Sequence, residues 1–380
     1  MYDKVGFTSS RKVVRGFASL TGTCLLVLPA TVFAADLVEA ETPALAQEVY
    51  PAITGSLELE LAKDRIYKSD DPLNEISDAG GSAALAVRMG LVPGFAINLG
   101  AALESVLDGE PGEDRYFEGM GLYVDTLNAE FSSGPFTLVA GKFGPGFGTA
   151  WDVTPGLYGT TFAEDYELSE MIGVGIAAEL GATAFGTITA SANAFFVDTT
   201  ALSESAFHNR GRTSLSDGGA GNTGHLDNFS LTLDGTDVPG LDGFSWHLGY
   251  RHLSAGRGDD SDESGVVAGF SQEHSLTESL DIVVTGEAAH FSGFGGADDK
   301  ATYLTGGIGL VSGPWHAEFA ANFRNIDYDG GGNDHDTLYQ VSAGYEFENG
   351  IDVSVGWAQT EEGGIQSDVV GIRLTKTIEF

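Results

Sequence analysis

The sequence predicts an all-β fold, a transmembrane antiparallel β-barrel of about 16 strands with short periplasmic turns and long extracellular loops. Three observations predict it: the composition, a repeated two-residue alternation of polarity, and a regular exchange of long and short connections. The 380 residues include 54 glycines, 23 phenylalanines and 12 tyrosines. At a mean hydropathy of +0.00, this composition favours many short strands over helices.

The alternation of polarity defines the strands. Leu57, Leu59 and Leu61 share one face of an extended segment, whereas Glu58 and Glu60 share the other. Segments of about ten residues with this period have the length of a membrane-spanning strand. An even count of sixteen places both chain ends in the periplasm, although fourteen or eighteen strands remain possible. The predicted strands are 52–62, 81–92, 94–105, 119–131, 135–143, 169–180, 184–197, 226–235, 242–253, 264–275, 280–291, 301–312, 314–325, 336–347, 351–360 and 368–380.

The connections between these segments alternate in length. Long polar connections at 63–80, 106–118 and 144–168 are each followed by a strand pair joined through only a few residues, such as 132–134. An antiparallel barrel produces this pattern because one end carries tight periplasmic turns and the other carries free extracellular loops. A soluble β-sandwich has no reason to sort its loops in this way.

The N-terminus carries an export signal. Arg11, Lys12 and Arg15 precede an apolar stretch that ends in small residues, which is typical of a secretory signal peptide. The alternative is a retained membrane anchor, but Pro29 interrupts a run that is already short. We therefore expect export to the outer membrane of a Gram-negative bacterium. The expected organisation is a signal peptide at 1–34, a short periplasmic segment without an assigned role at 35–51, and the barrel at 52–380.

Charge and reactive residues exclude several functions. The formal net charge is -37, so the phosphate backbone of a nucleic acid would be repelled. The single cysteine, Cys24, lies within the signal peptide, which leaves the exported chain without thiol chemistry. The eight histidines are scattered, and the sequence contains no His-Glu-x-x-His or Gly-x-Ser-x-Gly segment. We expect no enzymatic activity, although a spatial catalytic pair at the rim remains an alternative.

The last segment alternates from Val370 to an aromatic C-terminal residue, Phe380. A terminal strand of this form resembles the assembly signal of bacterial outer-membrane proteins, which implies recognition by the barrel-assembly machinery. Lys376 falls on the apolar face of this strand. A charge there is tolerable if the long side chain carries its ammonium group to the nearby headgroups.

Residues 141–152, Gly-Lys-Phe-Gly-Pro-Gly-Phe-Gly-Thr-Ala-Trp-Asp, resemble the Gly-Lys/Arg-Phe…Pro-Phe-Gly segment of the phosphate-selective and siderophore-porin families. Residues 166–170 resemble the segment with which those families re-enter the barrel, and Gly146 departs from their pattern. The resemblance implies a Gram-negative outer-membrane porin whose loop 144–168 folds into the lumen. It further implies contact with outer-membrane lipid and lipopolysaccharide, and it is compatible with a homotrimer, but it selects no substrate.

Loop 144–168 and the wet face of the strands supply the candidate pore residues. Acidic side chains on the loop and just beyond it would favour cations if they line the constriction, since no Lys or Arg follows Lys142 there. Four arginines on inferred inward positions would form a basic wall facing this acidic loop; alternatively, all these charges are simply solvated. The constriction candidates are Asp152, Glu164, Asp165, Glu167 and Glu170, and the wall candidates are Arg88, Arg251, Arg324 and Arg373.

Three functions are compatible with this pattern. The first is a water-filled channel for passive diffusion of small hydrophilic solutes that prefers cations. The second is a substrate-selective channel for a ferric siderophore or similar solute, and the third is a plugged adhesive or structural barrel. No cofactor is expected. Acidic loops such as 259–263 and 327–336 could hold Ca²⁺ through oxygen ligands, but they lack EF-hand spacing, which favours solvated hydrophilic loops.

Overall fold

The computed structural model describes residues 50–107 and 109–380. The predicted signal peptide and residues 35–49 of the predicted periplasmic segment lie outside this range. Among the described residues, no helix combines the length and the apolar character needed to cross a membrane.

Eighteen strands form one sheet, and two of them contain only two residues each, which leaves sixteen long strands. All pairings between neighbouring long strands are antiparallel. The long strands are β1 (Ala52–Ser69), β2 (Ser77–Val92), β3 (Phe95–Ser105), β5 (Met120–Ser133), β6 (Phe136–Phe143), β7 (Met171–Thr183), β8 (Gly186–Val197), β10 (Asn228–Thr236), β11 (Phe244–Leu253), β12 (Glu263–Thr277), β13 (Leu280–Ser292), β14 (Lys300–Ser312), β15 (Trp315–Asp327), β16 (Asn333–Glu346), β17 (Ile351–Glu362) and β18 (Ile365–Glu379). The prediction of about sixteen strands is confirmed.

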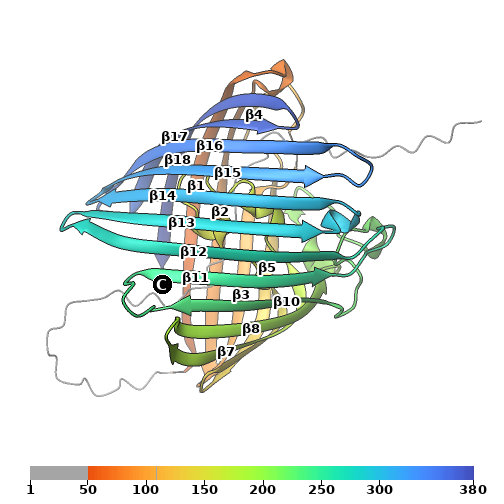
Figure 1. The fold of residues 1–380 in the computed structure, drawn as a ribbon, viewed down its shortest axis with the longest axis vertical. Coiled ribbons are helices and arrows are strands. Elements are labelled where there is room, and N and C mark those ends of the chain that lie inside the picture. The colour runs from red at the N-terminus through yellow and green to blue at the C-terminus, as the bar shows by residue number, and fades with distance from the viewer. Residues whose placement is uncertain (1–49, 108) are drawn as a thin grey trace, which may run out of the picture.

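The sheet closes on itself, because the first long strand pairs with the last (Figure 1). Leu57 lies across from Ile378, and Leu61 lies across from Leu374. At the chain end, the backbone N–H of Gly55 donates to the carbonyl of Phe380 at 2.9 Å, and the reverse bond measures 3.0 Å. Closure leaves the long strands without an open edge, as a barrel in lipid requires.

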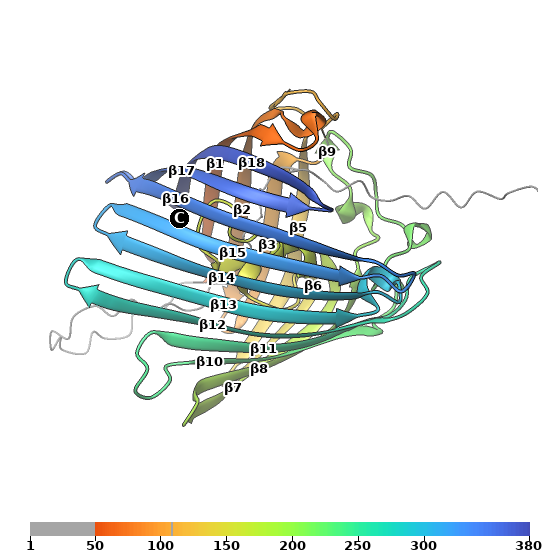
Figure 2. The same ribbon diagram turned by 45° about the horizontal axis from the view of Figure 1, so that its top comes forward.

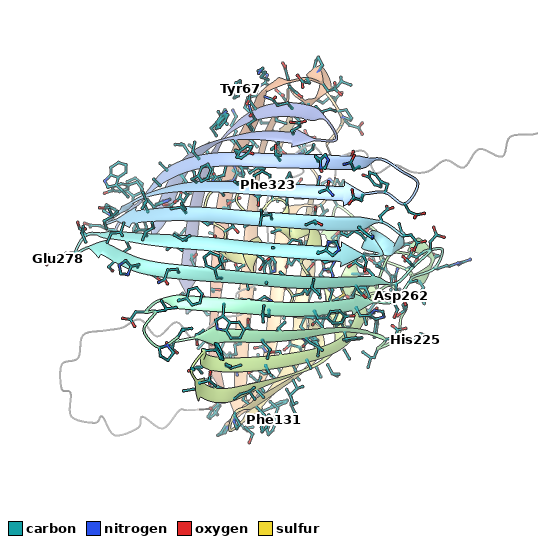
Figure 3. The ribbon with its side chains drawn as sticks, viewed as in Figure 1. Tyr67, Phe131, His225, Asp262, Glu278 and Phe323 are labelled. Carbon is teal, nitrogen blue, oxygen red and sulfur yellow. The ribbon has the colours of Figure 1, made fainter. Side chains whose placement is uncertain are left out.

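The outer face of the ring is apolar. Leu61 is 53% exposed and Val355 is 54% exposed, and side chains of this type recur at alternate positions along the strands. Figure 3 shows Phe323 on the outer face of β15. An apolar surface that continues around a whole barrel is stable only in contact with lipid, so the strands span a membrane.

The two ends of the barrel differ in their connections, as the sequence predicts. Glu278 lies in the short turn after β12, and Asp262 lies in the loop before the same strand, at opposite ends of the barrel in Figure 3. The turn between β2 and β3 contains only two residues, and Gly94 adopts a φ of +76° there, a conformation that favours glycine.

The strand boundaries differ from the prediction where strands leave the membrane. β1 continues to Ser69 instead of ending near residue 62, because residues 63–66, 68 and 69 stay paired with β18 after the apolar alternation stops. The strand β4 (Arg115–Tyr116) and the strand β9 (Ala206–Phe207) were not predicted. Two residues are too few to show a period.

Lys376 faces outward on β18, and its Nζ donates to the carbonyl of Asn349 in the short turn before β17. The long side chain thus carries the charge to the periplasmic end of the barrel, which explains how a lysine is accommodated on the apolar face.

Candidate pore constriction

The loop between β6 and β7 folds into the barrel. It contains the short helix α1 (Ala150–Val153) and the 3-10 turn η2 (Ala163–Tyr166), and its chain, yellow in Figure 2, lies within the ring of strands. Phe147 and Tyr166 of the loop pack on Phe291 of β13, with ring centroids 5.7 Å from the Phe291 ring in both cases. Burial of each aromatic side chain contributes about 2 kcal/mol to stability, so apolar packing stabilises the position of the loop inside the barrel.

Hydrogen bonds fix the start of the loop to the inner wall. The backbone N–H of Gly148 donates to Nε2 of His247 on β11 at 3.1 Å. On β13, Glu287 accepts from the backbone N–H of Thr149 at 2.7 Å and from the Tyr166 hydroxyl at 2.6 Å. One carboxylate therefore holds both the beginning and the end of the loop.

The middle of the loop rests on wall glycines. A Cβ added at Gly307 would lie 2.5 Å from Pro155, and one added at Gly371 would lie 2.1 Å from the Tyr158 hydroxyl. That hydroxyl donates to Asp64 of β1 at 2.6 Å. The absence of side chains at these wall positions lets the loop backbone approach the sheet closely.

Arg251, a predicted wall residue, lies beneath the loop. Its side chain binds Glu263 with distances of 2.9 and 2.6 Å, donates to the carbonyl of Tyr166 at 2.6 Å, and lies over the Phe147 ring. Arg251 is only 3% exposed. It therefore lies between the wall and the loop, where it supports the loop and does not present its charge to the lumen.

Arg324 and Arg373 also lie where the loop meets the wall. Arg324 binds Asp165 of the loop at 2.7 Å and Asp336 of β16 at 2.8 Å. Arg373 binds Asp64 at 2.8 Å, beside Tyr158. We expected the arginines to face the loop from across the pore, whereas these two contact the loop directly. Strand parity predicts which residues point inward, but it does not predict what covers them.

Arg88, the fourth predicted wall residue, lies away from the other three. It is near the short-turn end of β2, where it binds Glu130 at 2.7 Å. Its side chain is 46% exposed. Arg88 therefore contributes to the lumen near the periplasmic mouth and not to the loop.

Asp165 and Glu170, both predicted constriction acids, are paired with cations. Asp165 binds Arg324 and accepts from the Tyr303 hydroxyl at 3.0 Å. Glu170 binds Lys142 at 2.7 Å and receives a two-pronged contact from Arg210 at 2.8 and 2.6 Å. These two carboxylates fix the loop and its exit rather than adding net negative charge to the lumen.

The other three, Asp152, Glu164 and Glu167, belong to a larger acidic group. Burial raises the pKa of Glu164 to about 7, the hydrogen bond from Thr160 opposes the rise, and the charges of Asp165 and Glu104 add to it.

Burial also raises the pKa of Glu167 to about 7, with Glu164, Asp152, Asp125 and Glu104 as further causes. Because Glu104 lies on β3 and Asp125 on β5, the acidic edge of the loop faces an acidic part of the wall.

Sequence reasoning predicted a long second loop, from β8 to β10, but assigned no site residue to it. Lys142 is buried and binds Asp198 of this loop at 2.8 Å. Arg210 of the same loop lies 3.8 Å from the centre of the Tyr123 ring, and the Tyr123 hydroxyl donates to Glu104 at 2.5 Å. A long loop has no period that would place Arg210 beside the constriction, so nothing in the sequence indicated it.

The predicted acidic loop at 259–263 accepts hydrogen bonds from neighbouring loop segments. The Asp259 carboxylate accepts from the backbone N–H of Gly219 at 3.2 Å and from that of Gly256 at 2.8 Å. Within residues 50–107 and 109–380, no group of three or more His, Asp or Glu side chains is arranged to hold a metal ion.

Comparison with known proteins identifies the fold. No protein-family model matches the sequence, and no curated protein matches it. Among solved structures, the outer membrane channel DcaP of Acinetobacter baumannii is similar over 86% of this chain and 96% of its own, with a TM-score of 0.56 and 11% identity. The fold is that of an outer-membrane porin.

Two other structures with the porin fold cover nearly all of their own length. OccAB3 of Acinetobacter baumannii matches 86% of this chain and 99% of its own, with a TM-score of 0.54 and 12% identity. An anion-selective porin of Comamonas acidovorans matches 87% and 99%, with a TM-score of 0.52 and 11% identity. Barrels of this porin fold, with a lipid-facing belt, lie in the outer membrane of Gram-negative bacteria.

Proposed function

We propose that the protein is a porin that lets small hydrophilic solutes diffuse across the outer membrane and that prefers cations. The observation that carries the proposal is the distribution of charge around loop 144–168. Arg251, Arg324 and Arg373 are paired with carboxylates on the side of the loop that rests on the wall. Glu164 and Glu167 of the loop face the acidic wall of β3 and β5.

A narrow passage with carboxylates on both sides concentrates cations and repels anions, because the low-dielectric barrel wall focuses their field. Asp152 is exposed, and it lies within electrostatic reach of Glu58 on β1, so this acidic strip continues toward the first strand. The proposal differs from the selectivity named for the Comamonas acidovorans porin, which shares only the fold.

Conductance in planar bilayers tests the proposal. The refolded chain is inserted under a salt gradient, and the reversal potential is compared with that of the variant D152N/E164Q/E167Q. We expect stable open steps, a reversal potential on the cation side, and a clear loss of cation preference in the variant. A matched control replaces three exposed acids of other loops, Glu110, Glu113 and Asp329, and should keep the preference.

Two results would contradict the proposed passive channel. A folded, heat-modifiable barrel without conductance would support the plugged adhesive or structural barrel instead. Block of an otherwise conducting channel by micromolar ferric siderophore would support the substrate-selective channel. The trimer implied by the sequence resemblance is tested separately, by the mass of the detergent-solubilised protein.

A further inference from the structure

The guanidinium of Arg210 lies in a site that other segments of the chain build. Arg210 belongs to the loop between β8 and β10, and its Cζ lies 3.8 Å from the centre of the Tyr123 ring on β5. Its Nη1 and Nη2 donate to the two carboxylate oxygens of Glu170, at 2.8 and 2.6 Å. An aromatic face and a carboxylate that accepts two parallel hydrogen bonds are partners well matched to a planar guanidinium. Tyr123 and Glu170 thus form a guanidinium site that Arg210 occupies.

The carboxylate of the guanidinium site is held independently of Arg210. Lys142 of β6 binds Glu170 at 2.7 Å and Asp198 at 2.8 Å, and the side chains of Lys142 and Asp198 are each 1% exposed. Glu170 adopts a φ of +53°, a left-handed conformation that is unfavourable for residues other than glycine and that recurs at ligand-binding positions. The ion pair with the buried Lys142 therefore keeps this strained carboxylate in position whether or not Arg210 is bound.

The loop that carries Arg210 has other contacts with the wall. Its short strand β9 (Ala206–Phe207) pairs with β5. The Nζ of Lys142 donates to the carbonyl of Leu202 at 3.0 Å. Because these contacts do not involve the side chain of Arg210, the guanidinium can leave the site without release of the loop.

The guanidinium site is partly open to water and adjoins the acidic wall. The side chains of Arg210 and Glu170 are each 22% exposed. The Tyr123 hydroxyl donates to Glu104 at 2.5 Å, and Glu104 lies within electrostatic reach of both Arg210 and Glu167. The site therefore lies beside the acidic wall of β3 and β5, where the local field concentrates solute cations.

We propose that the guanidinium site binds soluble cations that carry a guanidinium group, and that Arg210 is an internal ligand that such a cation displaces. The solute guanidinium stacks on the Tyr123 ring and donates two hydrogen bonds to Glu170, in the place that Arg210 vacates. An ammonium group lacks the planar fork that makes both contacts at once. This inference deepens the proposed function by naming a class of cation, and it rests on that function for passage of the solute but not for binding.

Isothermal titration calorimetry of the full-length folded barrel in detergent tests the site with two dications of similar length. Agmatine carries a guanidinium and an ammonium group, and cadaverine carries two ammonium groups. We expect R210A to bind agmatine at least about tenfold more tightly than the wild type, because no tethered guanidinium competes for the site. The affinity for cadaverine should change less than about threefold.

Two further variants separate the guanidinium site from a general effect on the loop. In R210A/Y123L the gain for agmatine should fall to about threefold or less, because the aromatic face is lost. R212A is the matched control, since Arg212 lies on the same loop and donates to the carbonyl of Thr199 at 3.0 and 2.8 Å. Its affinity for agmatine should stay within about twofold of the wild type.

Several results would overturn the proposal. They are equal agmatine affinity in the wild type and R210A, equal gains for agmatine and cadaverine, a full gain in R210A/Y123L, and the same gain in R212A. Heat-modifiable gel mobility verifies folding. If R210A does not fold, Arg210→Lys, which keeps the charge but loses the planar fork, should still bind agmatine at least about threefold more tightly than the wild type. A folded barrel without conductance in planar bilayers would contradict the channel and leave the calorimetric result intact.

Discussion

The guanidinium of Arg324 on β15 binds the carboxylate of Asp165 in the pore loop at 2.7 Å, across a separation of 159 residues in the sequence. The same guanidinium binds Asp336 and Glu362, at 2.8 and 3.2 Å. One cation therefore contacts three carboxylates and joins the loop to β16 and β17.

Replacement of Arg324 by alanine should loosen the loop and destabilise the barrel by roughly 3–5 kcal/mol, because it leaves three partly buried carboxylates without their cation. Thermal unfolding in detergent measures the loss, and noisier single-channel currents should accompany it. The control is Arg88→Ala, since Arg88 forms a single ion pair near the periplasmic mouth and its loss should cost about 1 kcal/mol or less. Equal losses in the two variants would show that Arg324 has no special role.

Cation preference should depend on pH. Because the pKa values of Glu164 and Glu167 are each raised to about 7, these groups are mostly neutral at pH 6 and mostly ionised at pH 8. Reversal potentials under a salt gradient should move toward the cation value as pH rises through 7. In E164Q/E167Q this shift should shrink by about half or more. A variant curve that overlies the wild-type curve would exclude these two carboxyls as its source.

The same two groups have an effect of opposite sign on stability. Folding raises their pKa above the ordinary value of 4.5, so their ionisation opposes folding increasingly from about pH 4.5 to 7, and fully above pH 7. E164Q/E167Q should therefore unfold at a higher temperature than the wild type at pH 8, and the difference should shrink at pH 5. A gap that stays constant over this range would contradict the assignment.

Gly371 should be intolerant of even one methyl group. In Gly371→Ala the added Cβ would meet the Tyr158 hydroxyl and an oxygen of Asp64, so the loop must move off the wall and the single-channel conductance should change. Gly306→Ala is the matched control on the same barrel, since the nearest atom there is 3.7 Å away. Identical conductance of both variants would mean that the loop does not depend on this close contact.

His247 should act as an anchor for the loop. It accepts the Gly148 N–H at Nε2, and its Nδ1 pairs with Asp234 at 2.6 Å. His247→Leu leaves a buried backbone donor without a partner and should cost about 1–3 kcal/mol, read from thermal unfolding. His274→Leu, at an exposed position near a short turn, is the control and should be nearly neutral.

The sequence predicted the strands well for a physical reason. Leu57, Leu59 and Leu61 face the lipid side and Glu58 and Glu60 face the interior of the barrel, so the two different environments impose a two-residue period on the strand. Beyond Leu61 the outward positions carry Lys63 and Arg65 instead of apolar residues, so the period disappears. The prediction therefore stopped near residue 62, although the strand continues to Ser69.

The site was only partly predictable. Parity placed Arg251 on the inner face, but only the folded loop shows that Phe147 and the Tyr166 carbonyl cover it. Insertion of the loop was expected from resemblance to known porins, not from spacing. Arg210 was missed because its position depends on contacts with Glu170 and Tyr123, which no local pattern encodes.

The pairing of β1 with β18 has a consequence for biogenesis. Gly55 and Phe380 are among the residues that seal the ring, so the seam needs the final residues of the chain. A barrel that lacks β18 has an unpaired edge on β1, and such an edge pairs readily with other chains. The barrel is therefore protected from edge-to-edge aggregation only when its last strand is in place.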